Sequence, residues 1–248
     1  MARVPLRSRL LAVAACCALA GGLTACSGDE PPDNADLVAG KKAFTEKCGS
    51  CHVLGRAGTK GVQGPNLDEA FRRSMKDGLG RGTVRGAVHS QIIHPATVPE
   101  SNKVAYMPAN LVRGKLAEDV AAYVAASVSL TGKDEGLLAV AVPVAGAGKP
   151  VVASGGTLQL PADPNGQLAY ITKVASAKPG QLTIESKNEA AIPHDIALEG
   201  GGVNEKGETV QGGGVSKISA SVKAGKYQFY CTISGHREGG MEGVLTVK

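Results

Sequence analysis

Residues 48–52 read Cys48-Gly49-Ser50-Cys51-His52, and this stretch decides how the first half of the chain folds. On a helix, two residues three apart or four apart project toward the same side, so both thiols and the imidazole face one way. Such thiols can bond the vinyl groups of a haem while the imidazole reaches the iron. The competing interpretations are a chance pairing with an unrelated histidine and a redox-active dithiol. The motif predicts covalent haem on Cys48 and Cys51, with His52 as an iron ligand.

The residues around this motif favour helices. From Ala35 to Cys48, apolar residues recur at helical spacing, and Asn34 is available as a cap. A second helix is expected over the apolar positions from Leu116 to Val124. Between the two helices, residues 55–110 are expected to be rich in loops.

Residues 35–128 resemble a class I cytochrome c. The features that carry the resemblance are Gly40 and Phe44 before the motif, Gly64-Pro65-Asn66-Leu67 after it, Met107-Pro108, and a closing helix through Tyr123. The resemblance implies an all-α haem domain in which Gly40 lets Tyr123 pack closely. It also implies Met107 as the second iron ligand, with the Pro65 carbonyl orienting the His52 ring.

The second iron ligand has competitors in the same region. A lone methionine is often core filler, and Met75, His89 and His94 are alternatives to Met107. Methionine raises the potential of a haem relative to a second histidine, and six-coordinate iron has no open position for a substrate. A Met107 ligand therefore points to electron transfer.

A second set of metal-binding residue types lies near the end of the chain. Cys231, His236 and Met241 occur in one loop with four residues between each one and the next, and His194 lies upstream. Two histidines, one cysteine and a long axial methionine are the ligands of a blue copper site. The alternative is a buried free thiol, two surface histidines and a core methionine. The joint spacing favours copper.

The sequence from residue 156 onward alternates like short strands separated by Gly, Asn and Pro. The expected strands are Leu158 to Leu160, Leu182 to Ile184, Ile192 to Leu198, Lys217 to Val222, Tyr227 to Cys231 and Val244 to Val247. This region resembles a cupredoxin of the plastocyanin and rusticyanin type, which implies a Greek-key β-sandwich. One departure is Asp195, where many members have Asn or Ser, and it puts in doubt the bond that ties the two ligand loops together.

The first 34 residues carry export signals. A basic start with three arginines precedes the apolar run Leu10 to Leu19, and Leu23-Thr24-Ala25-Cys26 follows. This segment resembles a bacterial lipoprotein signal, which implies a lipid on Cys26. A membrane-spanning helix is the alternative, although the run is shorter than the ~20 residues that a bilayer requires. A further alternative is cleavage elsewhere, which would release a soluble exported product.

The chain of 248 residues has room for two compact domains. The expected division is a signal peptide at 1–25, a tether at 26–34, a cytochrome c domain at 35–131, a linker at 132–155 and a cupredoxin domain at 156–248. The overall fold class is α+β, multidomain. Removal of residues 1–25, with three arginines and no acid, lowers the formal charge from +5 to +2. This weak charge and the absence of Trp give no support to nucleic-acid binding.

Five histidines are too few for further catalytic copper once three serve as ligands. The sequence therefore predicts a carrier and not an enzyme: a lipid-anchored, extracytoplasmic or periplasmic respiratory protein with one haem c and one type 1 copper. Its expected partners are a quinol-oxidising complex and a terminal oxidase or reductase. Two alternatives remain: a haem that binds peroxide or another small ligand after weak Met107 ligation, and a copper-delivery protein.

Overall fold

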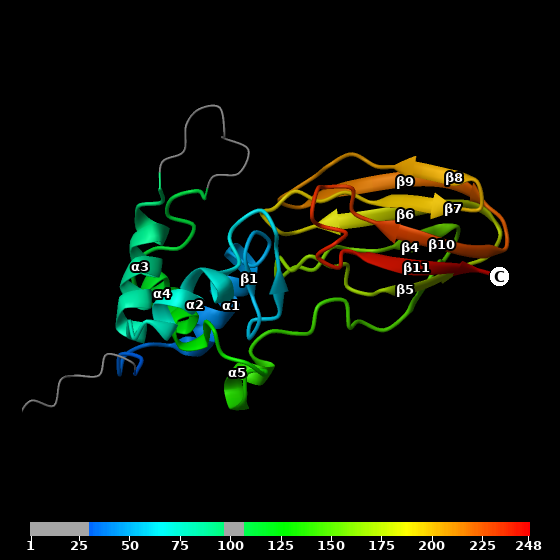
Figure 1. Cartoon of the computed structure of the whole chain (residues 1–248). Coiled ribbons are helices and arrows are strands. Elements are labelled where there is room, and N and C mark those ends of the chain that lie inside the picture. Colours follow the sequence, from blue (N-terminus) through cyan, green and yellow to red (C-terminus); the bar gives the residue numbers. More distant parts are fainter. Residues whose placement is uncertain (1–29, 97–106) are drawn as a thin grey trace, which may run out of the picture.

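The computed structural model describes residues 30–96 and 107–248. The expected signal peptide and Cys26 lie outside the described residues. A helical domain precedes a β-sandwich, and the two lie end to end (Figure 1). In the part of the chain that the structure describes, no helix combines the length and apolar character needed to cross a bilayer.

The described residues of the helical domain form four helices and a short hairpin. The helices are α1 (Leu37–Lys47), α2 (Leu67–Lys76), α3 (Arg81–Ile93) and α4 (Lys115–Ser127), and the hairpin pairs β1 (Val53–Leu54) with β2 (Thr59–Lys60). The expectation of a loop-rich region from 55 to 110 is wrong, since α2 and α3 lie within it. The side chain of Asn66 caps α2 by accepting from the N–H of Glu69.

The cap of α1 also differs from the expectation. Asp36, and not Asn34, precedes the helix, and its carboxylate accepts hydrogen bonds from the N–H groups of Val38 and Ala39 at 3.0 and 2.9 Å. The Asp36 N–H in turn donates to Asp119 of α4. The cap thus satisfies the start of α1 and ties it to the last helix of the domain.

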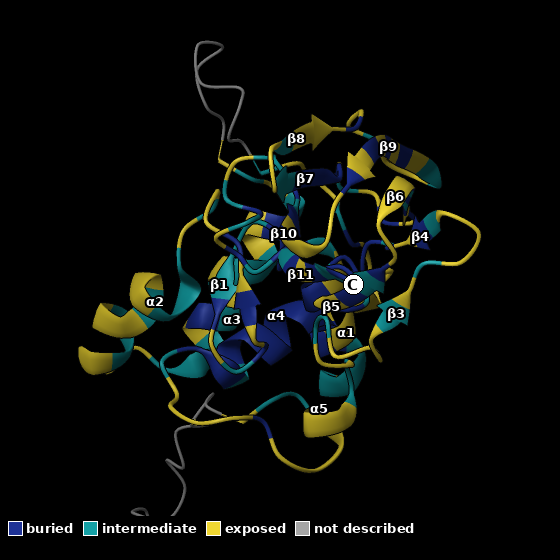
Figure 2. Ribbon diagram, turned by 90° about the vertical axis from the view of Figure 1, so that its right-hand side faces the viewer, coloured by how far each residue is buried: buried dark blue, intermediate teal, exposed yellow. Residues whose placement is uncertain are grey.

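Helices α1 and α4 pack closely because α1 has a glycine where they cross. A Cβ on Gly40 would lie 2.2 Å from the Asp119 carbonyl oxygen and 3.0 Å from Cβ of Tyr123. Tyr123 is fully buried, and its ring lies 6.3 Å from that of Phe44, centre to centre. The expected packing of Tyr123 against Gly40 is confirmed, and α4 forms the buried centre of the domain (Figure 2).

The second domain is a sandwich of two sheets. Its strands are β3 (Val151–Val152), β4 (Thr157–Gln159), β5 (Val174–Ala177), β6 (Gly180–Asn188), β7 (Ala197–Gly200), β8 (Val203–Lys206), β9 (Gly214–Val222), β10 (Gly225–Tyr230) and β11 (Glu242–Val247). One sheet has the order β3-β5-β11-β10-β7-β8 and the other β4-β6-β9. The sandwich is confirmed, whereas β3, β5 and β8 were not among the expected strands.

Several neighbouring strands are parallel. β5 runs parallel to β3 and β11, and β4 runs parallel to β6. The remaining strand pairs of the sandwich are antiparallel. Parallel pairs arise here because consecutive strands alternate between the two sheets: β4 and β6 belong to one sheet, while β5 belongs to the other.

The core of the sandwich holds the alternating residues of its central strands. Tyr227, Phe229 and Cys231 are all buried, so these three alternating side chains share one face. Tyr170 packs edge-on against Phe229 at 5.5 Å between ring centres. Cys231 and Met241 belong to the same buried cluster, so the expected copper ligands lie at the edge of an apolar core.

The segment between the domains makes specific contacts with both. Asp134 is buried in the helical domain, where its carboxylate contacts Lys41 Nζ at 2.9 Å, Arg56 Nε at 2.9 Å and the Tyr123 hydroxyl at 2.8 Å. Lys41 also donates to the Leu138 carbonyl in the short helix α5 (Gly136–Val140). The first part of the segment is therefore fixed to the helical domain.

The later part of the segment is fixed to the sandwich. The Gln167 amide donates to the Pro143 carbonyl at 3.0 Å, and the Gly148 N–H donates to the Ile171 carbonyl at 2.8 Å. β3 then joins the larger sheet beside β5. Only residues 139–142 lie between the Leu138 and Pro143 attachments.

Candidate metal centres

The Cys48–His52 motif lies in a turn directly after α1. The helix ends at Lys47, and Cys48 is its C-terminal cap. The N–H groups of Cys51 and His52 donate to the Cys48 carbonyl at 3.1 and 2.9 Å. The motif is thus not part of the helix proper, but these bonds continue the helical hydrogen-bond pattern through its residues.

The His52 ring is held in one orientation. Its Nδ1 lies 2.9 Å from the Pro65 carbonyl oxygen, as the resemblance implies. A Cβ on Gly64 would lie only 2.5 Å from Cε1 of His52, so the glycine leaves room for the ring. The Pro65 bond occupies Nδ1 and leaves Nε2 as the ring atom for a metal.

The two cysteines of the motif are free thiols that differ in exposure. Cys48 is buried and Cys51 is half-buried. Burial, followed by the nearby Cys51, raises the pKa of Cys48 to about 12. The two sulfurs, with an oriented imidazole beside them, fit the attachment of a haem.

Burial alone does not decide whether Met75 or Met107 is the better candidate for the second iron ligand. Met107 and Met75 are both half-buried and both pack against the core of the domain. Met107 lies in the loop that leads to α4, whereas Met75 lies in the last turn of α2. The positions of both methionines are compatible with a contact to a group bound in the core.

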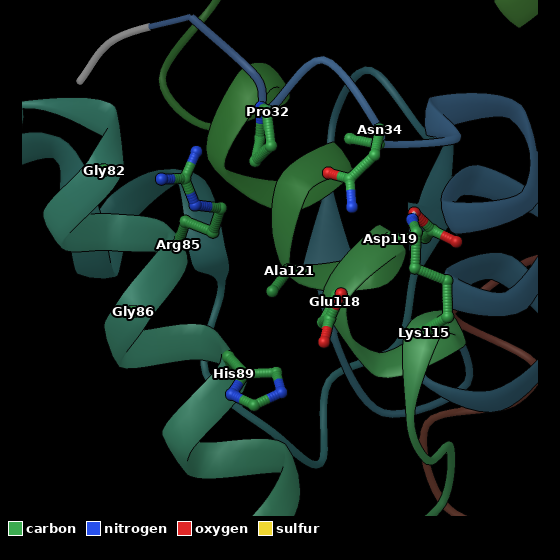
Figure 3. Close-up of a pocket in the computed structure, with 11 residues that line it drawn as sticks. Pro32, Asn34, Gly82, Arg85, Gly86, His89, Lys115, Glu118, Asp119 and Ala121 are labelled. Atoms are coloured by element: carbon green, nitrogen blue, oxygen red, sulfur yellow. The ribbon is translucent and has the colours of Figure 1, made fainter. Parts of the chain in front are cut away.

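The competing histidines lie elsewhere. His94 is exposed at the end of α3. His89 lines a groove of about 340 Å³ with Arg85 of α3 and Glu118 of α4. Figure 3 shows His89 pointing into this groove. Val84 and Ile92 of the same helix are buried in the core, whereas His89 is only half-buried.

Three of the expected copper ligands converge in the sandwich. His194 follows β6 and pairs with Val210 through two backbone hydrogen bonds, while Cys231 and His236 follow β10. The two histidine Nδ1 atoms lie 3.2 Å apart, and the Cys231 sulfur lies 3.5 Å from Nδ1 of His236. All three residues are buried, with ligand atoms within 4.8 Å of one another. This donor set suits a cation between the rings.

Met241 closes the same loop. The Cys231 N–H donates to the Met241 carbonyl, and the Met241 N–H donates to the His236 carbonyl at 2.9 Å. The methionine side chain is fully buried. The loop therefore carries thiol, imidazole and thioether groups, and it lies at the end of the sandwich that faces the helical domain (Figure 1).

Burial keeps the three donors neutral in the protein alone. It lowers the pKa of His194 to about 3, with repulsion from His236 adding to the effect, and it also lowers the pKa of His236. Burial raises the pKa of Cys231 to about 12, partly opposed by hydrogen bonds from the backbone of Asp195 and Ile233. Neutral imidazoles are ready to bind a metal, and a bound cation would displace the thiol proton.

Asp195 ties the two ligand-bearing segments together. Its fully buried carboxylate accepts hydrogen bonds from the N–H and the hydroxyl of Thr232, each at 2.7 Å. The Thr209 hydroxyl donates to it at 3.3 Å, and Lys206 Nζ lies 3.6 Å away. The doubt raised by this residue in the sequence is resolved, because the aspartate makes the bond between the loops.

Arg237 supports the ligand loop from outside. Its guanidinium donates to Glu199 at 2.7 Å and to Glu242 at 3.1 Å, and it also contacts Gln228. It stacks over the Tyr230 ring at 4.0 Å. The residue next to His236 is thereby bound to three strands of the larger sheet.

Two family models match the chain. Residues 157–248 match the copper binding proteins of the plastocyanin/azurin family, and residues 37–127 match cytochrome c. The chain is a cytochrome c domain followed by a cupredoxin domain. The cytochrome c domain implies haem c, and the cupredoxin domain implies type 1 copper at the His194, Cys231 and His236 cluster. These domains make the chain an electron-transfer protein, and such proteins act with redox partners outside the cytoplasm.

Solved structures of blue copper proteins are similar to part of the chain. Reduced auracyanin from Roseiflexus castenholzii is 25% identical over 39% of this chain and 99% of its own, with a TM-score of 0.35. Auracyanin A from Chloroflexus aurantiacus is 22% identical over 40% of this chain and 100% of its own, with a TM-score of 0.34. No match was found among curated proteins.

Several residues of this cytochrome c–cupredoxin chain were not expected from the sequence. The Asp134 cluster and the Arg237 contacts join segments far apart in the chain, and no local pattern signals them. The bond between Thr232 and Asp195 could have been predicted from the sequence, because Thr232 directly follows Cys231 and its hydroxyl and N–H can both donate to a carboxylate.

Proposed function

We propose that this protein is a lipid-anchored, extracytoplasmic carrier that passes electrons between a quinol-oxidising complex and a terminal oxidase or reductase. In this proposal, Cys48 and Cys51 hold the haem, and His52 and Met107 bind its iron. His194, Cys231, His236 and Met241 bind the copper. The groups held by these residues each accept and release one electron.

The buried convergence of the His194, Cys231 and His236 donor atoms is the observation that carries this proposal. A site closed by four protein side chains has no place for a substrate, so it favours electron transfer over catalysis. The burial of all three residues also limits exchange of a bound ion, which favours a resident copper over copper that is delivered elsewhere.

Visible spectra of the purified protein test the two centres. The oxidised protein is expected to show an intense thiolate-to-copper absorption together with the bands of a six-coordinate haem. Carbon monoxide binding by the reduced protein would contradict the Met107 ligand and support the small-ligand alternative. A colourless cuprous ion that passes readily to an acceptor would support copper delivery instead.

The anchor is tested separately at Cys26. Mass spectrometry of the membrane-extracted protein is expected to find a lipid-modified residue 26 as the mature N-terminus. A Cys26→Ser variant is expected to appear in the soluble extracytoplasmic fraction with unchanged spectra. Recovery of this variant in the membrane fraction would contradict the lipid anchor.

A further inference from the structure

The two domains touch close to both candidate centres. A Cβ built on Gly235 would lie 2.6 Å from Cγ2 of Val62, so the valine methyl packs against the backbone of the copper-ligand loop. A second contact places Gly166 of the sandwich against Glu46 near the end of α1, where an added Cβ would lie 2.5 Å from the Glu46 carbonyl oxygen. Both contacts require glycine on the sandwich side.

Val62 belongs to the loop that lines the haem motif. Its neighbour Gly61 packs so closely on the motif that an added Cβ would lie 2.3 Å from the Ser50 carbonyl carbon. The amide oxygen of Gln63 lies 3.7 Å from the Cys51 sulfur, and the Gly64 N–H donates to the Cys51 carbonyl at 2.8 Å. The residues on both sides of Val62 thus contact the residues that would hold the haem.

Gly235 has an equally direct connection to the other centre. It is bonded to His236, and its carbonyl accepts from the N–H of Gly239 in the same loop. Its φ of +80° and its contact with Val62 both disfavour any side chain at this position. The covalent distance from the domain contact to a copper-binding side chain is therefore one peptide bond.

The connecting segment supports a fixed arrangement of the domains. The Lys41 bond to Leu138 and the Gln167 bond to Pro143 leave only residues 139–142 between two attachments. Domains joined by a free linker move relative to each other by default. Here both ends of the segment are bound, so the contact between the loops can persist.

Resting on the proposed function, we propose that Val62 and Gly235 form the junction through which an electron passes between the two metal-binding segments. One centre is oxidised and the other is reduced by a single electron, and no bond or proton changes place. Val62 keeps 61% of its surface exposed, so the junction is narrow: one methyl group lies against one glycine.

The test compares Val62→Ala with Val215→Ala in the full-length protein loaded with both metals. Each variant trims an exposed valine, but Val215 lies on β9 and pairs with Lys187 within the sandwich. After rapid reduction of one centre, equilibration with the other is expected to slow several-fold in Val62→Ala and to stay unchanged in Val215→Ala. Equal rates in the two variants would overturn the proposal.

A second readout reports the contact itself. In the diamagnetic, fully reduced protein, nuclear Overhauser effects are expected between the Val62 methyl groups and the Gly235 α protons. A Gly-Ser pair inserted between Ala141 and Val142 is expected to weaken them and to slow equilibration. Absence of these effects in the unmodified protein would overturn the junction. Absence of the haem or copper absorption would instead overturn the proposed function, so the two failures are distinguishable.

Discussion

The carboxylate of Asp195 accepts both the N–H and the hydroxyl hydrogen of Thr232, at 2.7 Å each. Asp195 follows His194, and Thr232 follows Cys231, and we propose both of these preceding residues as copper ligands. The two segments that would bind copper are therefore joined by a negatively charged acceptor, and this charge is buried beside the metal-binding side chains.

We expect Asp195→Asn to raise the copper potential. A buried negative charge favours the oxidised ion, which carries one more positive charge than the reduced ion. The expected rise in potential is tens of millivolts. For one electron, ~59 mV corresponds to a difference of about 1.4 kcal/mol in the stabilisation of the two oxidation states. A redox titration of the copper absorption measures it. Glu205→Gln, on the exposed strand β8, is the control and should leave the potential unchanged. A lower potential in Asp195→Asn would contradict the argument.

Asp134 is expected to stabilise the helical domain. Asp134→Asn leaves buried Lys41 without its partner charge and should lower the free energy of unfolding by about 3 kcal/mol. Asp77→Asn, which removes an exposed pair with Arg73, should change it by less than about 0.5 kcal/mol. Denaturant unfolding followed by circular dichroism measures both. Similar losses in the two variants would show that burial of the Asp134 pair has no special effect.

The Asp134 carboxylate is also expected to make the stability of the helical domain depend on pH. Burial acts to raise the pKa of Asp134, but hydrogen bonds from Lys41, Tyr123 and Arg56 outweigh it and lower the pKa overall. The stabilisation by ionised Asp134 is therefore complete above its pKa in the unfolded chain, which is about 3.9. It is lost as the pH falls through the lowered pKa of Asp134 in the folded protein. Acid titration of stability should be shallower in Asp134→Asn than in the unmodified chain. Identical acid profiles would contradict this prediction.

Gly40 and Gly86 offer matched substitutions in two helices. Gly40→Ala forces a Cβ to within 2.2 Å of the Asp119 carbonyl oxygen and should destabilise the helical domain by about 1–3 kcal/mol. A Cβ on Gly86 of α3 meets nothing within 4 Å, so Gly86→Ala should stabilise the domain by about 0.5–1 kcal/mol. Thermal unfolding of both variants measures the difference in sign. A stabilising Gly40→Ala would contradict the close crossing of α1 and α4.

The second iron ligand is tested by one substitution at two positions. Met107→Leu should open a coordination position, so the reduced protein should bind carbon monoxide, which the unmodified protein resists. Met75→Leu replaces the other half-buried methionine of the domain and should bind none. Optical difference spectra record the binding. The opposite pattern would assign the ligand to Met75.

The residue types at the two centres were predictable because metal chemistry restricts them. Haem attachment demands two thiols and a histidine at fixed spacing, and a copper loop demands its own set of donors. Cys231 and His236 therefore stand out before any fold is known. The bond from Asp195 to Thr232 was not predicted, since the expectation followed the Asn or Ser of many cupredoxins rather than the donors present on Thr232.

Some helices and strands were missed in the prediction. Helix α2 does present an apolar stripe, because Leu67, Phe71 and Met75 recur at helical spacing and pack on the core, but the expectation of loops between 55 and 110 overlooked it. Helix α3 contains Gly82 and Gly86, which weaken its pattern. β8 is an edge strand with three exposed polar residues. The parallel pairs depend on connections between sheets, and alternation along one strand carries no information about its distant neighbour.

The Lys41–Asp134 pair has a practical consequence for dividing the chain. A fragment that stopped at residue 131 would keep every residue of the haem motif and the last long helix. It would, however, leave the buried Lys41 ammonium group and the Tyr123 hydroxyl without their partner Asp134. The smallest self-sufficient piece therefore extends through Leu138, whose carbonyl completes the surroundings of Lys41. The first part of the connecting segment is therefore required for the fold of the helical domain.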